Sequence, residues 1–369
     1  MMFPFYTERS ERERVKAREF GSWLKSRESE INDRREIPED VLGQLWEKGY
    51  YGYLIPSDRG GTGGSLFDLC LVLEELSPAS SSVSLSLLVQ SLGIMLLNQD
   101  RDLARRDGRL SRVINERKLL AFALSEPCRG RQGSGHETRA EKSGGGYKLS
   151  GRKVYVNQGR EADFTLVMAE SDRGPAIFLI AKGGAGVMVS KDFPRASARG
   201  LSWSEIIIND ALAEASGLVA EPGDGRRICE SGLRRAGALV SAMALGLVES
   251  VLAAPGGEPF SDAGFPRATA EAKVELEAGR ALCYQSAFGM DKNLSGAEAL
   301  SIASKIFSTE LALNFFSRAC RSQGAPALSP GHQLKQKLEF AELLGTLLGS
   351  NRVLLENLFE RQIGGLSAP

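Results

Sequence analysis

The fold is decided by two stretches in the middle of the chain, Leu124-Ser125-Glu126-Pro127-Cys128-Arg129-Gly130 and Gly151-Arg152-Lys153-Val154-Tyr155-Val156-Asn157-Gln158-Gly159. The second stretch alternates apolar and polar residues in the way that is typical of β-strands. Residues 164–169 and 176–181 are apolar runs that indicate buried strands, and Gly144-Gly145-Gly146 is typical of a hairpin turn. The middle of the chain is therefore predicted to form a compact β-barrel or sandwich.

Helical periodicity surrounds this β-region on both sides. Before it, apolar residues recur at three- and four-residue spacing, for example over residues 41–46. After it, the same spacing predicts four long helices, which begin at Arg226 and continue over residues 268–288, 297–320 and 334–359. The predicted fold class is α+β, with an N-terminal α-helical domain (1–118), a β-domain (119–221) and a C-terminal antiparallel four-helix bundle (222–369).

Composition favours a small-molecule ligand. The chain has 46 Lys and Arg residues against 46 Asp and Glu residues, so no nucleic-acid partner is expected. Neither His136 nor His332 has a second His or a Cys at ligand spacing, so no metal site is expected. The cysteines form no CxxC pair, which indicates buried free thiols rather than disulfides: Cys70, Cys128, Cys229, Cys283 and Cys320.

The sequence shows no pattern typical of export or membrane insertion. Residues 7–36 are dense in Glu and Arg, unlike the apolar core of a signal peptide. The most apolar run, residues 83–97, is interrupted by Ser and Gln and is too short to span a bilayer. We therefore expect a cytoplasmic protein without a membrane partner.

The order of the three blocks, together with several short motifs, resembles the acyl-CoA dehydrogenase family. The motifs follow one another along nearly the whole chain: Gly49-Tyr50-Tyr51-Gly52, Glu74-Glu75-Leu76, Ser125-Glu126-Pro127, Gly151-Arg152-Lys153 and Leu245-Gly246-Leu247. The resemblance implies a flavoprotein oxidoreductase that carries out α,β-dehydrogenation of an acyl thioester, with FAD as the hydride acceptor. The acyl carrier that it implies is coenzyme A or a carrier protein.

The resemblance also implies where the flavin binds. Phe122, Leu124 and Ser125 fall where the family has its first flavin-contacting strand, and Ser125 replaces the usual threonine. Tyr155 stands where a tryptophan commonly covers the flavin, and Asn157 stands where a Ser or Thr hydroxyl contacts it. In the alternative interpretation, Phe122 and Tyr155 belong only to the core of the β-domain.

Two elements that bind the ADP part of FAD in the family are reduced in this sequence. Residues 253–264 keep only Pro259 and Phe260 of an Arg-x-x-Phe-Gly-x-Pro-Leu-x-x-Phe-Gln element. Gln323-Gly324-Ala325-Pro326 stands in place of a Gly-Gly-Tyr-Gly loop. FAD binding is therefore expected to be weakened.

A catalytic glutamate is missing from both positions where the family carries it. Most members have it just before a Gly-Thr pair near the carboxyl end, and this chain has Leu344 before Gly345-Thr346. A minority have it on the first bundle helix, where this chain has Ala236. Glu342 is therefore the predicted catalytic base, with Glu339 one turn earlier as the alternative. The other interpretation of Glu342 is an exposed charge on a helix.

Two arginines are the predicted substrate-binding residues. Arg131 follows Gly130, where the family has a serine near the substrate. Arg235 is adjacent to Ala236.

Two classes of function and several assemblies remain open on the sequence. The first class is a flavoenzyme with a relocated base. The second is a catalytically inactive family member, acting as partner subunit of a heteromeric dehydrogenase or as a ligand-binding or scaffold protein. The resemblance implies a homodimer or homotetramer, or a hetero-oligomer with an active paralogue. Leu311, Phe315 and Phe316 are interpreted either as an interface between subunits or as core within one chain.

Overall fold

The computed structural model describes residues 3–127, 136–253, 265–329 and 331–356. The chain divides into two compact units, and each is described by itself. Unit 1 comprises Met1–Ser26, Ser65–Ser84 and Arg234–Pro369, and unit 2 comprises Arg27–Gly64 and Leu85–Leu233. Each unit combines segments that are distant in sequence. The three domains with boundaries after residues 118 and 221 therefore stay a prediction.

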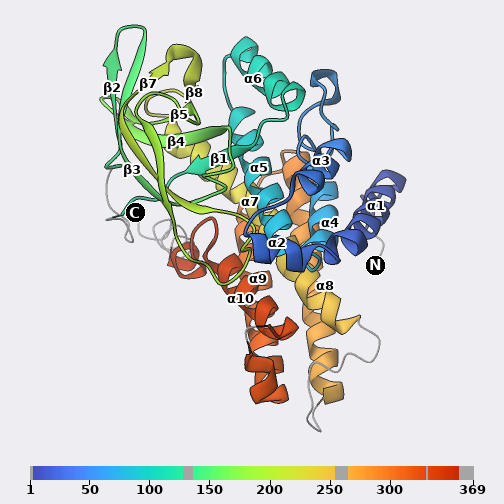
Figure 1. Ribbon diagram of the computed structural model, residues 1–369. Helices are drawn as coiled ribbons and strands as arrows, with labels where there is room; N and C mark the ends of the chain where they lie inside the picture. Colours follow the sequence, from blue (N-terminus) through green and yellow to red (C-terminus); the bar gives the residue numbers. More distant parts are fainter. Residues whose placement is uncertain (1–2, 128–135, 254–264, 330, 357–369) are drawn as a thin grey trace, which may run out of the picture. The chain divides into compact units, whose positions relative to one another are not determined.

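Unit 2 is built around one mixed β-sheet (Figure 1). Among the described residues the sheet has eight strands in the order β6-β7-β3-β2-β4-β5-β8, with β1 paired in parallel with β4. The strands are β1 (Leu120–Ala123), β2 (Arg139–Ser143), β3 (Gly146–Asn157), β4 (Phe164–Ser171), β5 (Gly174–Ala181), β6 (Val187–Asp192), β7 (Trp203–Glu214) and β8 (Leu218–Ala220).

The sheet encloses its own apolar core. Buried side chains from β1 to β8 form one cluster, which includes Val167, Phe178, Ile206 and Leu218. Leu218 of β8 belongs to this cluster, and Val187 and Val189 of β6 pack against it. These are the two end strands of the order, so the sheet curls around its core rather than lying flat. The prediction of a β-domain in the middle of the chain is confirmed.

The glycine-rich hairpin is also confirmed. Ser143 of β2 pairs with Gly146 of β3, which leaves Gly144 and Gly145 as a two-residue turn. Gly144 has a φ of 58°, the left-handed conformation that such turns require and that glycine adopts without strain.

The helical part of unit 2 contains α2 (Glu28–Arg34), α3 (Glu39–Glu47), the 3₁₀ turn η1 (Ser57–Arg59), most of α5 (Ser81–Leu97), α6 (Leu103–Asn115) and the 3₁₀ turn η2 (Ala215–Gly217). Asp102 caps α6, because its carboxylate accepts a hydrogen bond from the backbone N–H of Arg105 at 3.0 Å. The buried Asp100 forms ion pairs with Arg105 at 2.9 Å and Arg109 at 2.7 Å. The start of α6 is therefore fixed by charge as well as by its cap.

Unit 1 is helical. It contains α1 (Glu8–Lys25), α4 (Leu66–Leu76), α7 (Gly225–Leu252) from Arg234 onward, α8 (Phe265–Asp291), α9 (Ala297–Gln323), the 3₁₀ turn η3 (Ala325–Leu328) and α10 (Gln333–Thr346). Helices α7 to α10 confirm the predicted C-terminal bundle. Asp291, at the end of α8, accepts hydrogen bonds from the backbone N–H groups of Leu66 and Phe67 at 2.9 and 3.0 Å. It therefore joins the end of α8 to the start of α4.

Close packing between the helices of unit 1 depends on small residues. A Cβ at Gly246 of α7 would stand 2.0 Å from the carbonyl oxygen of Glu74 in α4.

Three apolar residues of α9 that were open to two interpretations are buried within the chain: Leu311, Phe315 and Phe316. The interpretation as core within one chain is therefore the correct one.

The predicted helix over residues 334–359 is wrong as one continuous element. Helix α10 ends at Thr346, and the chain becomes helical again at Asn351. Between them, Leu348 has a φ of 58° and Gly349 a φ of 101°, which interrupt the right-handed helix. Apolar residues continue through the break, so the apolar periodicity alone predicted one continuous helix.

Helix α7 is the one helix, within the described part of the chain, that is long and apolar enough to cross a membrane. Of its most apolar window, 72% is buried inside the chain, as is typical of a core helix.

The four cysteines in the described ranges are buried free thiols, as predicted: Cys70, Cys229, Cys283 and Cys320. Burial raises the pKa of Cys229 to about 12 and raises the pKa of Cys320 and, well above its ordinary value, that of Cys70. Cys128 lies outside the described residues.

Candidate functional site

Three of the predicted flavin-contacting residues lie at the end of β1. Phe122 is in the strand, and Leu124 and Ser125 follow it directly. The carbonyl of Ser125 accepts a hydrogen bond from the N–H of Val154 in β3 at 2.9 Å. The Ser125 side chain is exposed, while Phe122 and Leu124 are half-buried. The structure therefore brings the end of β1 beside β3, and the flavin contacts of these residues stay a prediction.

Tyr155 is displayed by a β-bulge. The register of β3 against β7 shifts between Lys153 and Val156, and Tyr155 has a φ of 58°. A bulky residue with positive φ is unusual and persists only where its surroundings hold it there. Tyr155 is 49% exposed, so it is not part of the β-domain core.

Asn157 carries an unsatisfied buried acceptor. It lies at the end of β3, opposite Trp203 of β7. Its Oδ1 is buried, and no hydrogen-bond partner for this atom is found among the residues that the structure describes. A buried acceptor without a donor is costly, so the atom is free to accept a hydrogen bond from a bound ligand.

A buried ion pair lies between the same two strands. Lys153 Nζ is 2.7 Å from Glu126 Oε1, and the two side chains are 0% and 1% exposed. Burial alone would raise the pKa of Glu126, but the hydrogen bond and charge of Lys153 outweigh it and lower the pKa to about 2. Both residues belong to motifs quoted above, but their pairing was not predicted.

A cluster of three aromatic rings adjoins the bulge. The Tyr155 ring lies 4.6 Å from that of Phe193 and 4.8 Å from that of Trp203. The guanidinium of Arg195 stacks on Trp203 at 5.5 Å, and its Nε and Nη2 are buried without a partner among the described residues. Burial lowers the pKa of Arg195 to about 10. No motif singled out Arg195, because its position depends on the folded loop between β6 and β7.

The predicted base lies in unit 1. Glu342 is exposed on α10, whereas Glu339 is half-buried and lies 3.6 Å from Lys335. At the two usual positions for a carboxylate, Leu344 and Ala236 are both 0% exposed. The structure thus shows buried apolar groups at both usual positions, and the role of Glu342 stays a prediction.

The two predicted substrate-binding arginines are Arg235 and Arg131. Arg235 is half-buried in α7, and its Nη2 is 3.4 Å from the carbonyl oxygen of Met290 in α8. Arg131 lies outside the described residues, as does most of the reduced ADP-binding element at residues 254–264.

Lys305 is a buried cation that the sequence patterns did not indicate. The side chain is buried in α9, and its ammonium donates to the carbonyls of Gly345 and Gly349, each at 3.0 Å, and to Asn351 Oδ1 at 2.7 Å. Burial lowers the pKa of Lys305 to about 8. Because all three ammonium hydrogens have acceptors, Lys305 holds the end of α10 in place rather than acting as a base.

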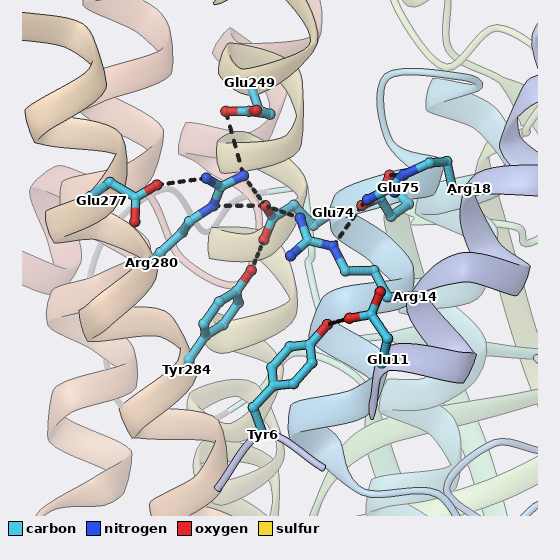
Figure 2. Close-up of polar contacts among 10 residues, drawn as sticks. All are labelled: Tyr6, Glu11, Arg14, Arg18, Glu74, Glu75, Glu249, Glu277, Arg280 and Tyr284. Carbon is cyan, nitrogen blue, oxygen red and sulfur yellow. Dashed lines mark hydrogen bonds and ion pairs between the residues drawn. The ribbon is translucent and has the colours of Figure 1, made fainter. Parts of the chain in front are cut away.

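Figure 2 shows a second charged cluster in unit 1, centred on the buried Glu74 of α4. Glu74 pairs with Arg280 of α8 at 2.6 Å and with Arg14 of α1 at 3.4 Å, and the hydroxyl of Tyr284 also donates to it. Burial, followed by the neighbouring Glu74 charge, raises the pKa of Tyr284 well above its ordinary value. Each charge is paired, so the cluster joins three helices and offers no reactive group.

A cavity of about 250 Å³ in unit 2 is lined by polar residues whose charges pair with one another, including Asp100 with Arg105 and Arg101 with Asp224. No group of three or more His, Cys, Asp or Glu side chains in the described ranges could hold a metal ion.

The chain matches three family models in chain order. Residues 7–101 match the acyl-CoA dehydrogenase N-terminal domain, residues 121–211 the middle domain and residues 223–363 the C-terminal domain. The chain therefore belongs to the acyl-CoA dehydrogenase family, and the resemblance found in its motifs is confirmed. Family membership supports an oxidoreductase of the flavoprotein type with FAD as cofactor.

Relatives and solved structures agree with this assignment. The chain is 26% identical to cyclohexane-1-carbonyl-CoA dehydrogenase of Syntrophus aciditrophicus over 88% of each chain. It superposes on butyryl-CoA dehydrogenase from Megasphaera elsdenii with a TM-score of 0.89, at 23% identity over 96% of this chain and 98% of that one. It superposes on an FAD complex of PigA with a TM-score of 0.87, at 21% identity over 99% of each chain. These two structural likenesses show the fold.

Proposed function

We propose that this protein is an acyl-CoA dehydrogenase-type flavoprotein that oxidises an acyl thioester between its α and β carbons, with FAD as the hydride acceptor. Family membership supports the reaction class. The observation that carries the proposal at the level of the site is the bulge of β3. It displays Tyr155 beside the exposed Ser125 and leaves Asn157 Oδ1 buried without a partner in the described part of the chain.

These residues fit a flavin. Asn157 Oδ1 supplies an acceptor for a ring N–H, and the Ser125 hydroxyl can donate or accept. Tyr155 supplies an exposed ring face for stacking, while Phe122 and Leu124 place strand backbone beside it. FAD, when bound, supplies the hydride acceptor that protein side chains lack.

Flavin retention is the first test. The purified protein is mixed with excess FAD and desalted, and its absorbance is recorded from about 300 to 550 nm, the range in which flavins absorb. A retained flavin spectrum supports the proposal. Protein that emerges without flavin contradicts it and favours the inactive family member.

We propose Glu342 as the base that removes the α-proton. Its support is its place two residues before Leu344, together with the exposure of its side chain. Glu342→Gln is expected to abolish thioester oxidation while flavin stays bound, because the amide cannot take up the proton. Glu339→Gln is the matched control on the preceding turn and is expected to retain turnover. Unchanged turnover in Glu342→Gln contradicts the assignment.

A second function is favoured by one observation, namely that both usual carboxylate positions hold buried apolar groups, Leu344 and Ala236. In this alternative the chain is an inactive partner subunit, a ligand-binding protein or a scaffold. Wild-type protein that retains FAD and binds acyl thioesters, but does not reduce the flavin with any of them, supports the alternative.

The proposal also covers the acyl carrier, the oligomeric state and the cellular location of the protein. The thioester is carried by coenzyme A or by a carrier protein, and Arg235 and Arg131 bind it. Anaerobic flavin reduction with matched acyl-CoA and acyl-carrier-protein substrates distinguishes the two carriers. We propose a homodimer or homotetramer in the cytoplasm, where the buried free thiols stay reduced.

A further inference from the structure

We propose that the buried Lys153–Glu126 pair is a positioning device for the flavin, which fixes the end of β1 against the bulge of β3. The inference rests on the proposed function, because it concerns the same site. It assigns a role to two residues that do not themselves touch the cofactor.

The pair is held from several sides. Lys153 Nζ donates to Glu126 Oε1 at 2.7 Å and lies 3.3 Å from the carbonyl oxygen of Leu124. Glu126 also accepts from the backbone N–H groups of Glu137 at 2.8 Å and Thr138 at 2.9 Å. Three segments, the end of β1, the two residues before β2 and the second half of β3, therefore meet at one carboxylate.

The position of the pair along the chain links it to the flavin site. Glu126 directly follows Ser125, and Lys153 precedes Tyr155 by two residues. The backbone hydrogen bond from Val154 to Ser125, at 2.9 Å, lies between the two partners. A displacement of either charged side chain would therefore move Ser125 and Tyr155 relative to each other.

The burial of the pair makes its geometry strict. The side chains of Lys153 and Glu126 are 0% and 1% exposed, so water does not reach them. The loss of one partner therefore leaves the charge of the other without an opposite charge beside it. The strands then have to shift until water or another group reaches that charge. Binding sites tolerate displacements of only about 0.5 Å before affinity and orientation suffer.

The chain offers a matched control in the next residue. Arg152 is also a cation on β3, but its side chain is half exposed and pairs with Glu205 of β7. Replacement of Arg152 removes one positive charge from the same strand without disturbing the contact between β3 and the end of β1.

The test compares Lys153→Met, Glu126→Gln and Arg152→Met with the wild-type protein. The dissociation constant for FAD is measured by fluorescence titration of apoprotein. The visible circular dichroism of the bound flavin is measured at saturating FAD, because that signal depends on how the ring is held and not on how stable the apoprotein is.

Lys153→Met is expected to weaken FAD binding by roughly tenfold or more and to change the flavin dichroism. Glu126→Gln, which is nearly isosteric, is expected to change both quantities in the same direction. Arg152→Met is expected to stay within about twofold of wild type with unchanged dichroism.

Unchanged affinity and dichroism in Lys153→Met and Glu126→Gln would overturn the inference and leave the proposed function standing. If Lys153→Met does not fold, Glu126→Gln decides the question alone. If the wild type and Arg152→Met both fail to bind FAD, the proposed function fails, and the positioning role falls with it.

Discussion

Tyr155 combines a positive φ of 58° with a large exposed ring, and a residue of this size keeps such a conformation only for a reason. Tilted contacts with the rings of Phe193 and Trp203 account for part of its surroundings, and the residue is still 49% exposed. We expect the exposed part of the ring to contact the flavin.

Tyr155→Ala is therefore expected to weaken FAD binding by up to about tenfold, the value of one aromatic contact. Tyr155→Phe keeps the ring and is expected to bind FAD like the wild type. Equal weakening in both variants would show that the hydroxyl, not the ring, makes the contact.

Glu126 gives the protein a specific sensitivity to acid. Its pKa is about 2 in the folded chain, against an ordinary value of 4.5, so the unfolded chain binds a proton at higher pH. The stability contributed by this carboxylate is complete above about pH 4.5 and is lost as pH falls toward 2.

Glu126→Gln is expected to flatten the dependence of unfolding free energy on pH in this window. Denaturant unfolding at a series of pH values measures the slope, and Glu342→Gln, which changes an exposed carboxylate, is the control. An unchanged slope in Glu126→Gln would show that its carboxylate does not link protonation to folding.

The sequence could single out Ser125, Tyr155 and Asn157 as candidates because they lie inside short motifs that can be compared position by position, and their contact with flavin stays a prediction. It could not predict the partner of Lys153, the unsatisfied amide oxygen of Asn157 or the stacking of Arg195. Those features depend on strand register and loop conformation, which only the folded chain displays.

Helix packing in unit 1 depends on the absence of a side chain at Gly246. Gly246→Ala places a Cβ about 2.0 Å from the Glu74 carbonyl oxygen, so α7 and α4 have to separate. We expect a loss of about 1–3 kcal/mol in the free energy of unfolding, measured by denaturant titration.

Gly108→Ala in α6 is the matched control, because nothing lies within 4 Å of an added Cβ there. Alanine favours a helix over glycine, so this variant is expected to gain up to about 1 kcal/mol. The same chemical change is thus expected to have opposite signs in the two helices, and a shared sign would contradict the packing argument.

The end of α10 depends on Lys305. Lys305→Met leaves the carbonyls of Gly345 and Gly349 without their buried donor, and we expect a loss of about 3 kcal/mol. Faster amide hydrogen exchange at residues 343–351 is the local measurement. The exposed Lys292→Met is expected to change stability by less than about 0.5 kcal/mol.

This contact also explains why helix α10 was predicted too long. The apolar pattern runs through Leu347 and Leu348, so periodicity alone continues the helix. The helix ends where Lys305, some forty residues earlier in the chain, binds the carbonyl of Gly345 in α10 and that of Gly349 in the break. A tertiary contact of this kind has no signature in the local sequence.

For the molecule as a whole, we expect a homodimer or homotetramer. Several large apolar side chains remain exposed in the described part of unit 1, among them Val274, Leu294 and Leu355, and such surface is often covered by a second copy. Light scattering after size exclusion measures the mass. Val274→Glu on α8 is expected to lower it if that face is an interface, and a monomeric wild type would contradict the expectation.

The buried thiols have a practical consequence for following how the molecule opens. Cys229 belongs to unit 2, and Cys70, Cys283 and Cys320 belong to unit 1. A thiol-alkylating reagent reacts with the thiolate, and burial keeps all four thiols out of its reach. Burial also raises the pKa of Cys70, Cys229 and Cys320, which keeps these three protonated. The rate of modification at each cysteine, measured by peptide mass spectrometry, therefore reports how fast each unit opens locally, and no engineered label is needed.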